Sequence, residues 1–219
     1  MRPIRIWYEK RNRLKYVSHL DMNRCWQRLL RRAGLPVWYT EGFKPHPYIN
    51  FALPLSLGYE SLCEAVDLRL TDDGVTNEQA AALLRAAAPA DLPVVQVTDP
   101  VKKFSEIGYA AFAFSLETDD IPADEAALAA FLAQEAVLCE KKTKKGTVKQ
   151  LNIRPGIRSM TITRGPDSPA LRMTLAAGGE GNINPALVLG ALRQQSGRAF
   201  ETARPVRTAL LDRDGAPFA

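Results

Sequence analysis

The chain has 219 residues, of which 46% are hydrophobic and 24% charged, so it can bury a sizeable core and has the composition of an ordinary globular protein. Its net charge of +5 and isoelectric point of about 9.2 favour contact with polyanions. The three cysteines are scattered, which excludes a clustered zinc or iron–sulfur site and indicates a reduced, cytoplasmic setting. No signal peptide and no apolar run of bilayer length stands out, so we expect no membrane contact.

The first half of the chain predicts the element order β-α-β-β-α-β. Two helices are expected, one capped by Ser18 and running to Ala33, the other capped by Thr76 and running to Ala88. Alternating or apolar runs predict strands over residues 3–9, 37–40, 62–70 and 92–98, with residues 48–52 extended. This is the split order of a ferredoxin-like unit.

The second half repeats that order after a connector at residues 99–108. Helices are expected over residues 124–135 and from Pro185, capped by Asn184, to Gln195. The extended segments are residues 109–118, 137–142, 148–153, 157–163, 170–176 and 206–211. We therefore predict an α+β fold with antiparallel sheets, made of two ferredoxin-like (βαββαβ) units in tandem, at residues 1–100 and 101–219, the second ending in a short tail.

The positive charge is concentrated in the first 50 residues. They hold eleven Lys and Arg against three Asp and Glu, a balance of +8, whereas the other 169 residues sum to −3. In the first predicted helix one stripe is apolar, and Asp21, Arg24, Arg28, Arg31 and Arg32 fall on or beside the opposite side. Such a row predicts phosphate contacts, with a plain solvated helix surface as the alternative.

The loop at residues 41–47 is the second unusual feature. Pro45 and Pro47 enclose His46 and stiffen the backbone, and stiff loops often carry functional groups. With His19 and Asp21, His46 forms a candidate acid–base set for RNA cleavage without a metal. Structural roles for both histidines, or a metal site built from the same side chains, are the alternatives; we predict no metal and no other cofactor.

Four short motifs surround these features. They are residues 18–24 (SHLDMNR), 31–37 (RRAGLPV), 42–47 (GFKPHP) and 51–58 (FALPLSLG). Together they closely resemble the radical SAM-linked protein family, a bacterial domain of unknown function found beside or fused to B12-binding-type radical SAM proteins. The resemblance covers residues 3–70 strongly and the rest weakly, and Lys44 stands where Asn is often expected. It implies a radical SAM enzyme as partner and RNA-directed work, but no activity.

Two further segments are candidates for anion binding. Residues 141–149 form a lysine-rich loop, and residues 177–182 are glycine-rich and precede a predicted helix N-terminus. The glycine-rich segment lacks the lysine and hydroxyl of a nucleotide-binding loop, so a simple connection is the stronger interpretation there.

The leading hypothesis is a non-catalytic accessory module that faces RNA or docks on a radical SAM enzyme, in tRNA or rRNA modification or processing. The chain itself lacks the cysteine cluster of such an enzyme. The predicted nucleic-acid contacts are Arg24, Arg28, Arg31, Arg32, Phe43, Lys44, Lys141, Lys142, Lys144, Lys145 and Lys149. The alternatives are a small RNA-processing enzyme that uses the histidines and a module that binds only protein.

Overall fold

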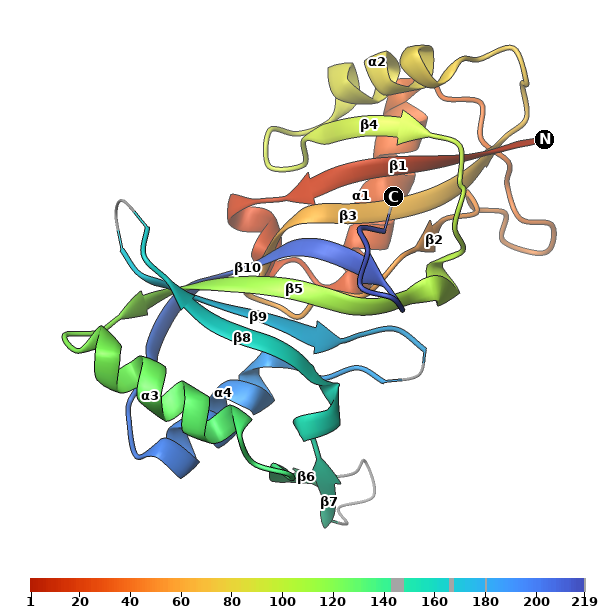
Figure 1. The fold of residues 1–219 in the computed structure, drawn as a ribbon. Helices are drawn as coiled ribbons and strands as arrows, with labels where there is room; N and C mark the ends of the chain where they lie inside the picture. Colours follow the sequence, from red (N-terminus) through yellow and green to blue (C-terminus); the bar gives the residue numbers. More distant parts are fainter. Residues whose placement is uncertain (143–147, 166–167, 180, 219) are drawn as a thin grey trace. The chain divides into compact units, whose positions relative to one another are not determined.

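The computed structural model describes residues 1–142, 148–165, 168–179 and 181–218. The chain divides into two compact units, residues 1–104 (unit 1) and 105–218 (unit 2), where the sequence predicted a division after residue 100. Each unit combines antiparallel strands with two helices (Figure 1), which confirms the α+β class. Of the helices in the described ranges, none is long and apolar enough to cross a membrane.

Unit 1 contains four strands and two α-helices. In chain order these are β1 (Arg2–Lys10), α1 (His19–Ala33), β2 (Asn50–Phe51), β3 (Glu60–Leu70), α2 (Asn77–Ala87) and β4 (Val94–Thr98), with a 3-10 helix at Asn12–Tyr16. The strands lie in the order β4-β1-β3-β2, and each neighbouring pair is antiparallel. Buried side chains of the strands and both helices form one core, in which Trp26 is fully buried.

Helix α1 forms where local sequence signals predict it. The Ser18 hydroxyl accepts a hydrogen bond from the Asp21 amide at 3.2 Å, which satisfies one unpaired donor of the first turn. Gly34 ends the helix in the left-handed conformation, with φ +64°. The predicted apolar stripe is buried, except that Cys25 is half-buried. The helix therefore turns the opposite, arginine-rich side to solvent.

The left-handed cap gives a first testable prediction. Gly34→Ala should lower the free energy of unfolding by about 1 kcal/mol, because a Cβ is unfavourable at positive φ although nothing lies within 4 Å of it. Gly190→Ala, inside a helix of unit 2 and equally uncrowded, is the matched control and should be neutral or stabilising. Urea denaturation measures both, and destabilisation of the control alone would contradict the assignment of the cap.

The predicted strand over residues 37–40 is wrong. The chain makes only isolated bridges there, from Val37 to Leu70 and from Tyr39 to Pro47. Prolines at positions 36, 45 and 47 donate no backbone hydrogen bond, so a continuous ladder cannot form. Instead, β2 takes the edge position beside β3, pairing Asn50 and Phe51 with Asp67 and Val66.

Unit 2 contains a four-stranded sheet, a separate hairpin and two helices. In chain order these are β5 (Ile107–Glu117), α3 (Ile121–Leu132), β6 (Leu138–Lys142), β7 (Val148–Asn152), β8 (Ile157–Thr163), β9 (Ala170–Ala176), α4 (Pro185–Ser196) and β10 (Glu201–Asp212). The sheet order is β10-β5-β9-β8, all antiparallel, and β6 pairs with β7. The residues after β10 are not a loose tail, because Phe218 is buried and its amide donates to the Leu210 carbonyl at 2.9 Å.

Candidate nucleic-acid interface

Four arginines occupy the outward side of α1. Arg24, Arg28, Arg31 and Arg32 are all exposed and, with Gln27, line an open groove of about 630 Å³; we call these four the arginine face. From residue 22 to residue 33 the helix carries no acidic residue. The arginine face is therefore a continuous surface of one sign along more than two helical turns.

The four arginines differ in whether their side chains already form bonds within the protein. Arg24 forms an ion pair with Asp21 at 2.9 Å, and Arg32 donates to the Ala87 carbonyl at the end of α2. Neither Arg28 nor Arg31 has a side-chain hydrogen bond or ion pair within the part of the chain that the structure describes. An exposed guanidinium without an internal acceptor keeps all five donors available to an anion.

Asp21 is held as an anion at the start of α1. The Ser18 hydroxyl donates to its carboxylate at 2.8 Å, and Arg24 donates at 2.9 Å. These two hydrogen bonds, that from Ser18 first, lower the pKa of Asp21 below its ordinary value. A carboxyl group with a lowered pKa is a poor general base near neutral pH, so Asp21 is better explained as part of the helix start.

Backbone hydrogen bonds close the base of the loop at residues 41–46, and we call this base, residues 38–40 and 46–48, the neck. Thr40 donates its amide to the His46 carbonyl at 2.9 Å, and the Tyr48 amide donates to the Trp38 carbonyl at 3.1 Å. All six residues of the loop are exposed, and Phe43 at its tip has a relative exposure of 107%. Hydrogen bonds close the base of the loop and its side chains face solvent, while the stiffness expected from the prolines stays a prediction.

His46 helps to hold this neck. Its Nδ1 lies 3.0 Å from the Lys44 carbonyl oxygen and 3.1 Å from the Thr40 hydroxyl. Because a carbonyl oxygen only accepts, we assign the ring proton to Nδ1, which leaves Nε2 as the unprotonated nitrogen of the neutral ring. The imidazole therefore has a structural role on one side and one available nitrogen on the other.

The two histidines of the candidate acid–base set have different partners. The His19 ring packs edge-on against Phe51, with ring centroids 4.9 Å apart, whereas His46 bonds to its own loop. In the described ranges no hydrogen bond or ring contact joins the two histidines, and no three His, Cys, Asp or Glu side chains gather into a metal-binding group. Cleavage by a histidine pair stays a prediction.

A cation–aromatic cluster lies at the base of the loop. The Arg69 guanidinium sits 5.5 Å from the ring centroid of Trp38 and 5.4 Å from that of Tyr48, and the two rings are 5.7 Å apart. Arg69 is exposed on β3 between the buried residues Leu68 and Leu70. Sequence reasoning missed Arg69, although strand alternation places it on the face opposite those two leucines.

The lysine-rich loop is only partly described. Lys141 and Lys142 belong to β6 and Lys149 to β7, with Lys141 paired to Lys149 in the backbone register. Lys144 and Lys145 lie outside the described residues. Their predicted contacts with nucleic acid stay a prediction.

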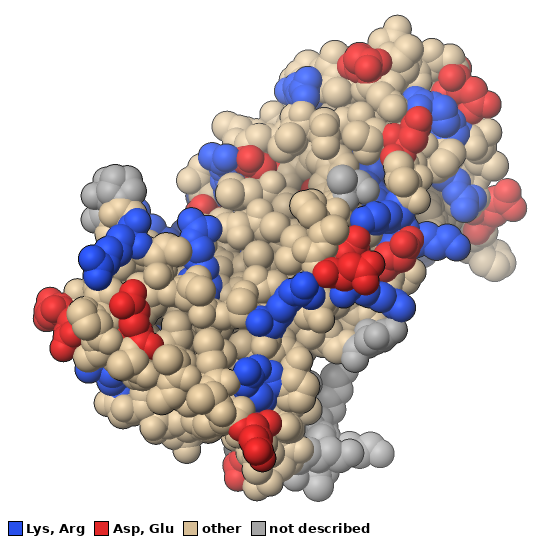
Figure 2. All heavy atoms as spheres, in the orientation of Figure 1, with Lys and Arg blue, Asp and Glu red and all other residues tan. Residues whose placement is uncertain are grey.

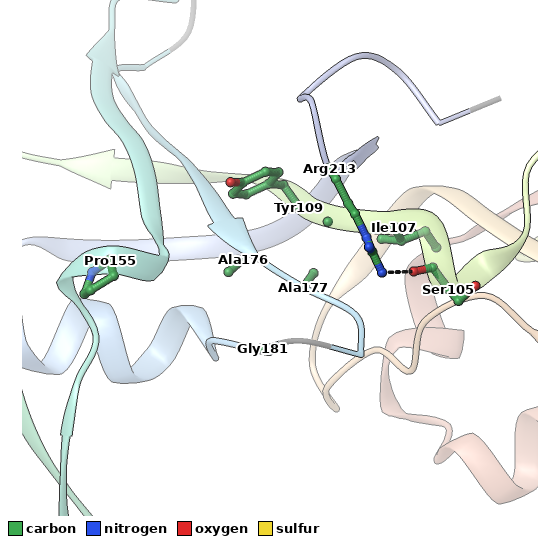
Figure 3. A pocket seen from close by; sticks show the side chains of 9 residues that line it. Ser105, Ile107, Tyr109, Pro155, Ala176, Ala177, Gly181 and Arg213 are labelled. Atoms are coloured by element: carbon green, nitrogen blue, oxygen red, sulfur yellow. Dashed lines mark hydrogen bonds between the residues drawn. The ribbon is translucent and has the colours of Figure 1, made fainter.

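A second candidate is a pocket of about 220 Å³ in unit 2 (Figure 3). Arg213 reaches over it and donates to the Ser105 carbonyl at 3.2 Å. The glycine-rich segment forms one wall, but it packs closely on β5: a Cβ on Gly178 would lie 2.3 Å from the Ile107 carbonyl oxygen, and φ there is +96°. Close packing explains Gly178, and Arg213 is already bonded to Ser105, so the pocket is a weaker anion site than the arginine face.

Other surfaces carry mixed charge. Figure 2 shows one face of each unit, where Lys and Arg side chains are interspersed with Asp and Glu. Elsewhere in unit 1, Arg13 forms an ion pair with Asp91 at 3.2 Å and Lys15 with Glu60 at 3.5 Å. Internal pairing of this kind reduces the attraction for an external polyanion, in contrast to Arg28 and Arg31.

Three comparisons relate this chain to known proteins. A family model described as "Uncharacterized protein conserved in bacteria (DUF2344)" matches residues 3–185. Among curated proteins none matches. A solved structure, "Crystal Structure of a Cbf5-Nop10-Gar1 Complex", contains a chain with a TM-score of 0.51 and 8% identity; the match covers 94% of the present chain and 48% of that chain, so the present chain spans about half its length. At this identity the likeness concerns the fold alone.

Proposed function

This chain belongs to the bacterial family DUF2344, and from that premise we propose that unit 1 binds RNA through the arginine face as a non-catalytic accessory module. The observation that carries the proposal is the exposure of Arg28 and Arg31 without internal bonding. Both are exposed on a helix surface of one sign, and both lack an internal partner in the described chain. A phosphate that binds there displaces only water and counterions, so little internal bonding is lost.

The geometry around the arginine face suits a polyanion better than a compact anion. Arg24 and Arg28, and Arg28 and Arg31 or Arg32, are spaced by three or four residues, so the Cβ atoms of successive arginines lie about 5–6 Å apart along the helix. Phosphates on one strand follow one another about 3.4 Å apart along the helix axis, so a row of arginines can contact several of them. Arg32, already bonded to α2, fixes one end of the row.

Both units also fit one fold description, which we include in the proposal. Each has the element order β-α-β-β-α-β and the corresponding strand order, β4-β1-β3-β2 in unit 1 and β10-β5-β9-β8 in unit 2. The β6–β7 hairpin is an insertion in unit 2. We therefore regard the chain as two ferredoxin-like units in tandem, the first of which supplies the arginine face.

The proposed partner is a radical SAM enzyme of the bacterial cytoplasm. The support is the sequence resemblance, whose motifs lie at the start of α1, at its end, in the loop 42–47 and after β2. All four belong to unit 1, the unit that carries the arginine face. In this proposal the module holds RNA while the partner carries out the chemistry.

The test is binding of labelled total tRNA to the full chain across a salt series, by fluorescence anisotropy. Because each phosphate contact releases a counterion, we expect the logarithm of the affinity to fall against the logarithm of salt with a slope of about −2 to −4. Poly-glutamate of matched charge is the competitor that separates RNA recognition from general anion binding. The absence of binding at low salt would contradict the proposal, as would equal competition by the polypeptide.

A further inference from the structure

Phe43 is the most exposed large apolar side chain among the described residues. It stands at the tip of the loop 41–46, and the neck below it is closed by bonds between Thr40 and His46. Gly42 beside it has φ +130°, a conformation that disfavours other residues. The fold therefore exposes an aromatic ring at the tip of a loop whose base is closed by hydrogen bonds, although burial of such a ring is favourable.

Cationic groups accompany this ring. Lys44 is the next residue and is exposed, and the neck leads to the cluster in which Arg69 lies over Trp38 and Tyr48. Tyr48 is 37% exposed and Trp38 is half-buried, so the cluster presents part of its surface to solvent. An exposed ring and an adjacent cation therefore lie in a loop whose base carries a partly exposed arginine–aromatic cluster.

We propose that this loop and the Trp38–Tyr48–Arg69 cluster bind unpaired bases, so that single-stranded RNA is the substrate class of the arginine face. The inference rests on the proposed RNA-binding function and specifies its ligand. Phe43 stacks on an exposed base, while Lys44 and Arg69 contact the neighbouring backbone. In a duplex the base faces are stacked on one another, and Phe43 has no free face to contact.

The flanking charge favours RNA over an apolar protein groove as the ligand. Lys44 and Arg69 would each need a paired acid in a protein interface, whereas a phosphate backbone supplies negative charge at every nucleotide. Aromatic rings interleaved with cations are the usual way in which single strands are bound with little sequence preference.

The experiment compares two fluorescein-labelled probes, a mixed-sequence RNA of roughly 12 nucleotides and the same RNA annealed to its complement. The full chain should bind the single strand more tightly. Phe43→Ala and Phe43→Leu should each weaken single-strand binding by about 5- to 150-fold and leave duplex binding unchanged, while Phe43→Trp retains it. The thermal midpoint should stay constant in all three variants because the ring is fully exposed.

Each of the other outcomes contradicts either this inference alone or the proposed function as well. Equal affinity of the wild type for both probes, or unchanged single-strand binding by Phe43→Ala, overturns the inference and leaves RNA binding by the arginine face standing. Wild-type affinity in Phe43→Leu with loss in Phe43→Ala shows an apolar contact, such as a protein would make, and also overturns it. No binding of either probe at low salt overturns the proposed function and this inference together.

Discussion

The double variant Arg28→Glu, Arg31→Glu is expected to bind RNA at least about 100-fold more weakly than the wild type at low salt. The change removes the two arginines that have no internal partner in the described chain and places two negative charges in the centre of the arginine face. The salt slope should become shallower by about two, since about one unit is lost per contact. Anisotropy with labelled tRNA measures both quantities.

Stability should change little in this variant. Both positions are exposed, and surface substitutions usually alter the free energy of unfolding by less than about 0.5 kcal/mol. Arg31 lies in the last turn of α1, where a negative charge opposes the helix dipole, so a further loss of about 0.3–1 kcal/mol is expected. The thermal midpoint therefore separates lost binding from lost folding.

Two controls identify the arginine face as the cause. Arg164→Glu with Arg172→Glu makes the same change in net charge at exposed positions of unit 2 and should leave affinity within about threefold of the wild type. Arg28→Lys with Arg31→Lys keeps the charge and should retain most of the binding. If the unit 2 variant weakened binding as strongly as the unit 1 variant, net charge would be responsible and the proposed interface would be wrong.

Trp26→Ala is expected to lower the free energy of unfolding by about 3–5 kcal/mol, the largest stability effect that we predict. Trp26 is fully buried in α1, and its ring meets Tyr8 edge-on with centroids 4.8 Å apart. Removal of the indole leaves a cavity between α1 and the sheet of unit 1. Urea denaturation followed by circular dichroism measures the change.

Trp26→Phe is the informative companion variant. The indole Nε1 is buried and has no hydrogen-bond partner among the described residues, so the native state already bears the cost of an unpaired donor. Phenylalanine keeps most of the packing and removes that donor, and the expected loss is about 1–2 kcal/mol. Val101→Ala, at an 85% exposed position, should have almost no effect. A Phe variant as unstable as the Ala variant would show that Nε1 has a partner.

Local signals in the sequence determined helix α1 and its exposed side. Apolar residues three and four positions apart define the buried stripe, Ser18 supplies the first hydrogen bond, and Gly34 permits the left-handed end. These features act within one or two helical turns, so they do not depend on the rest of the fold. The same periodicity is sufficient to predict that the arginine face lies in solvent.

The tertiary structure decided which arginines are available. Arg32 bonds to the carbonyl of Ala87, a residue 55 positions away on α2, and Arg69 reaches Trp38 and Tyr48 from β3. Tertiary packing also places His19 against Phe51, while His46 bonds within its own loop. At residues 37–40, two isolated bridges form in place of the predicted strand. Such contacts depend on how distant segments pack, and the periodicity of a single segment contains no information about its neighbours in space.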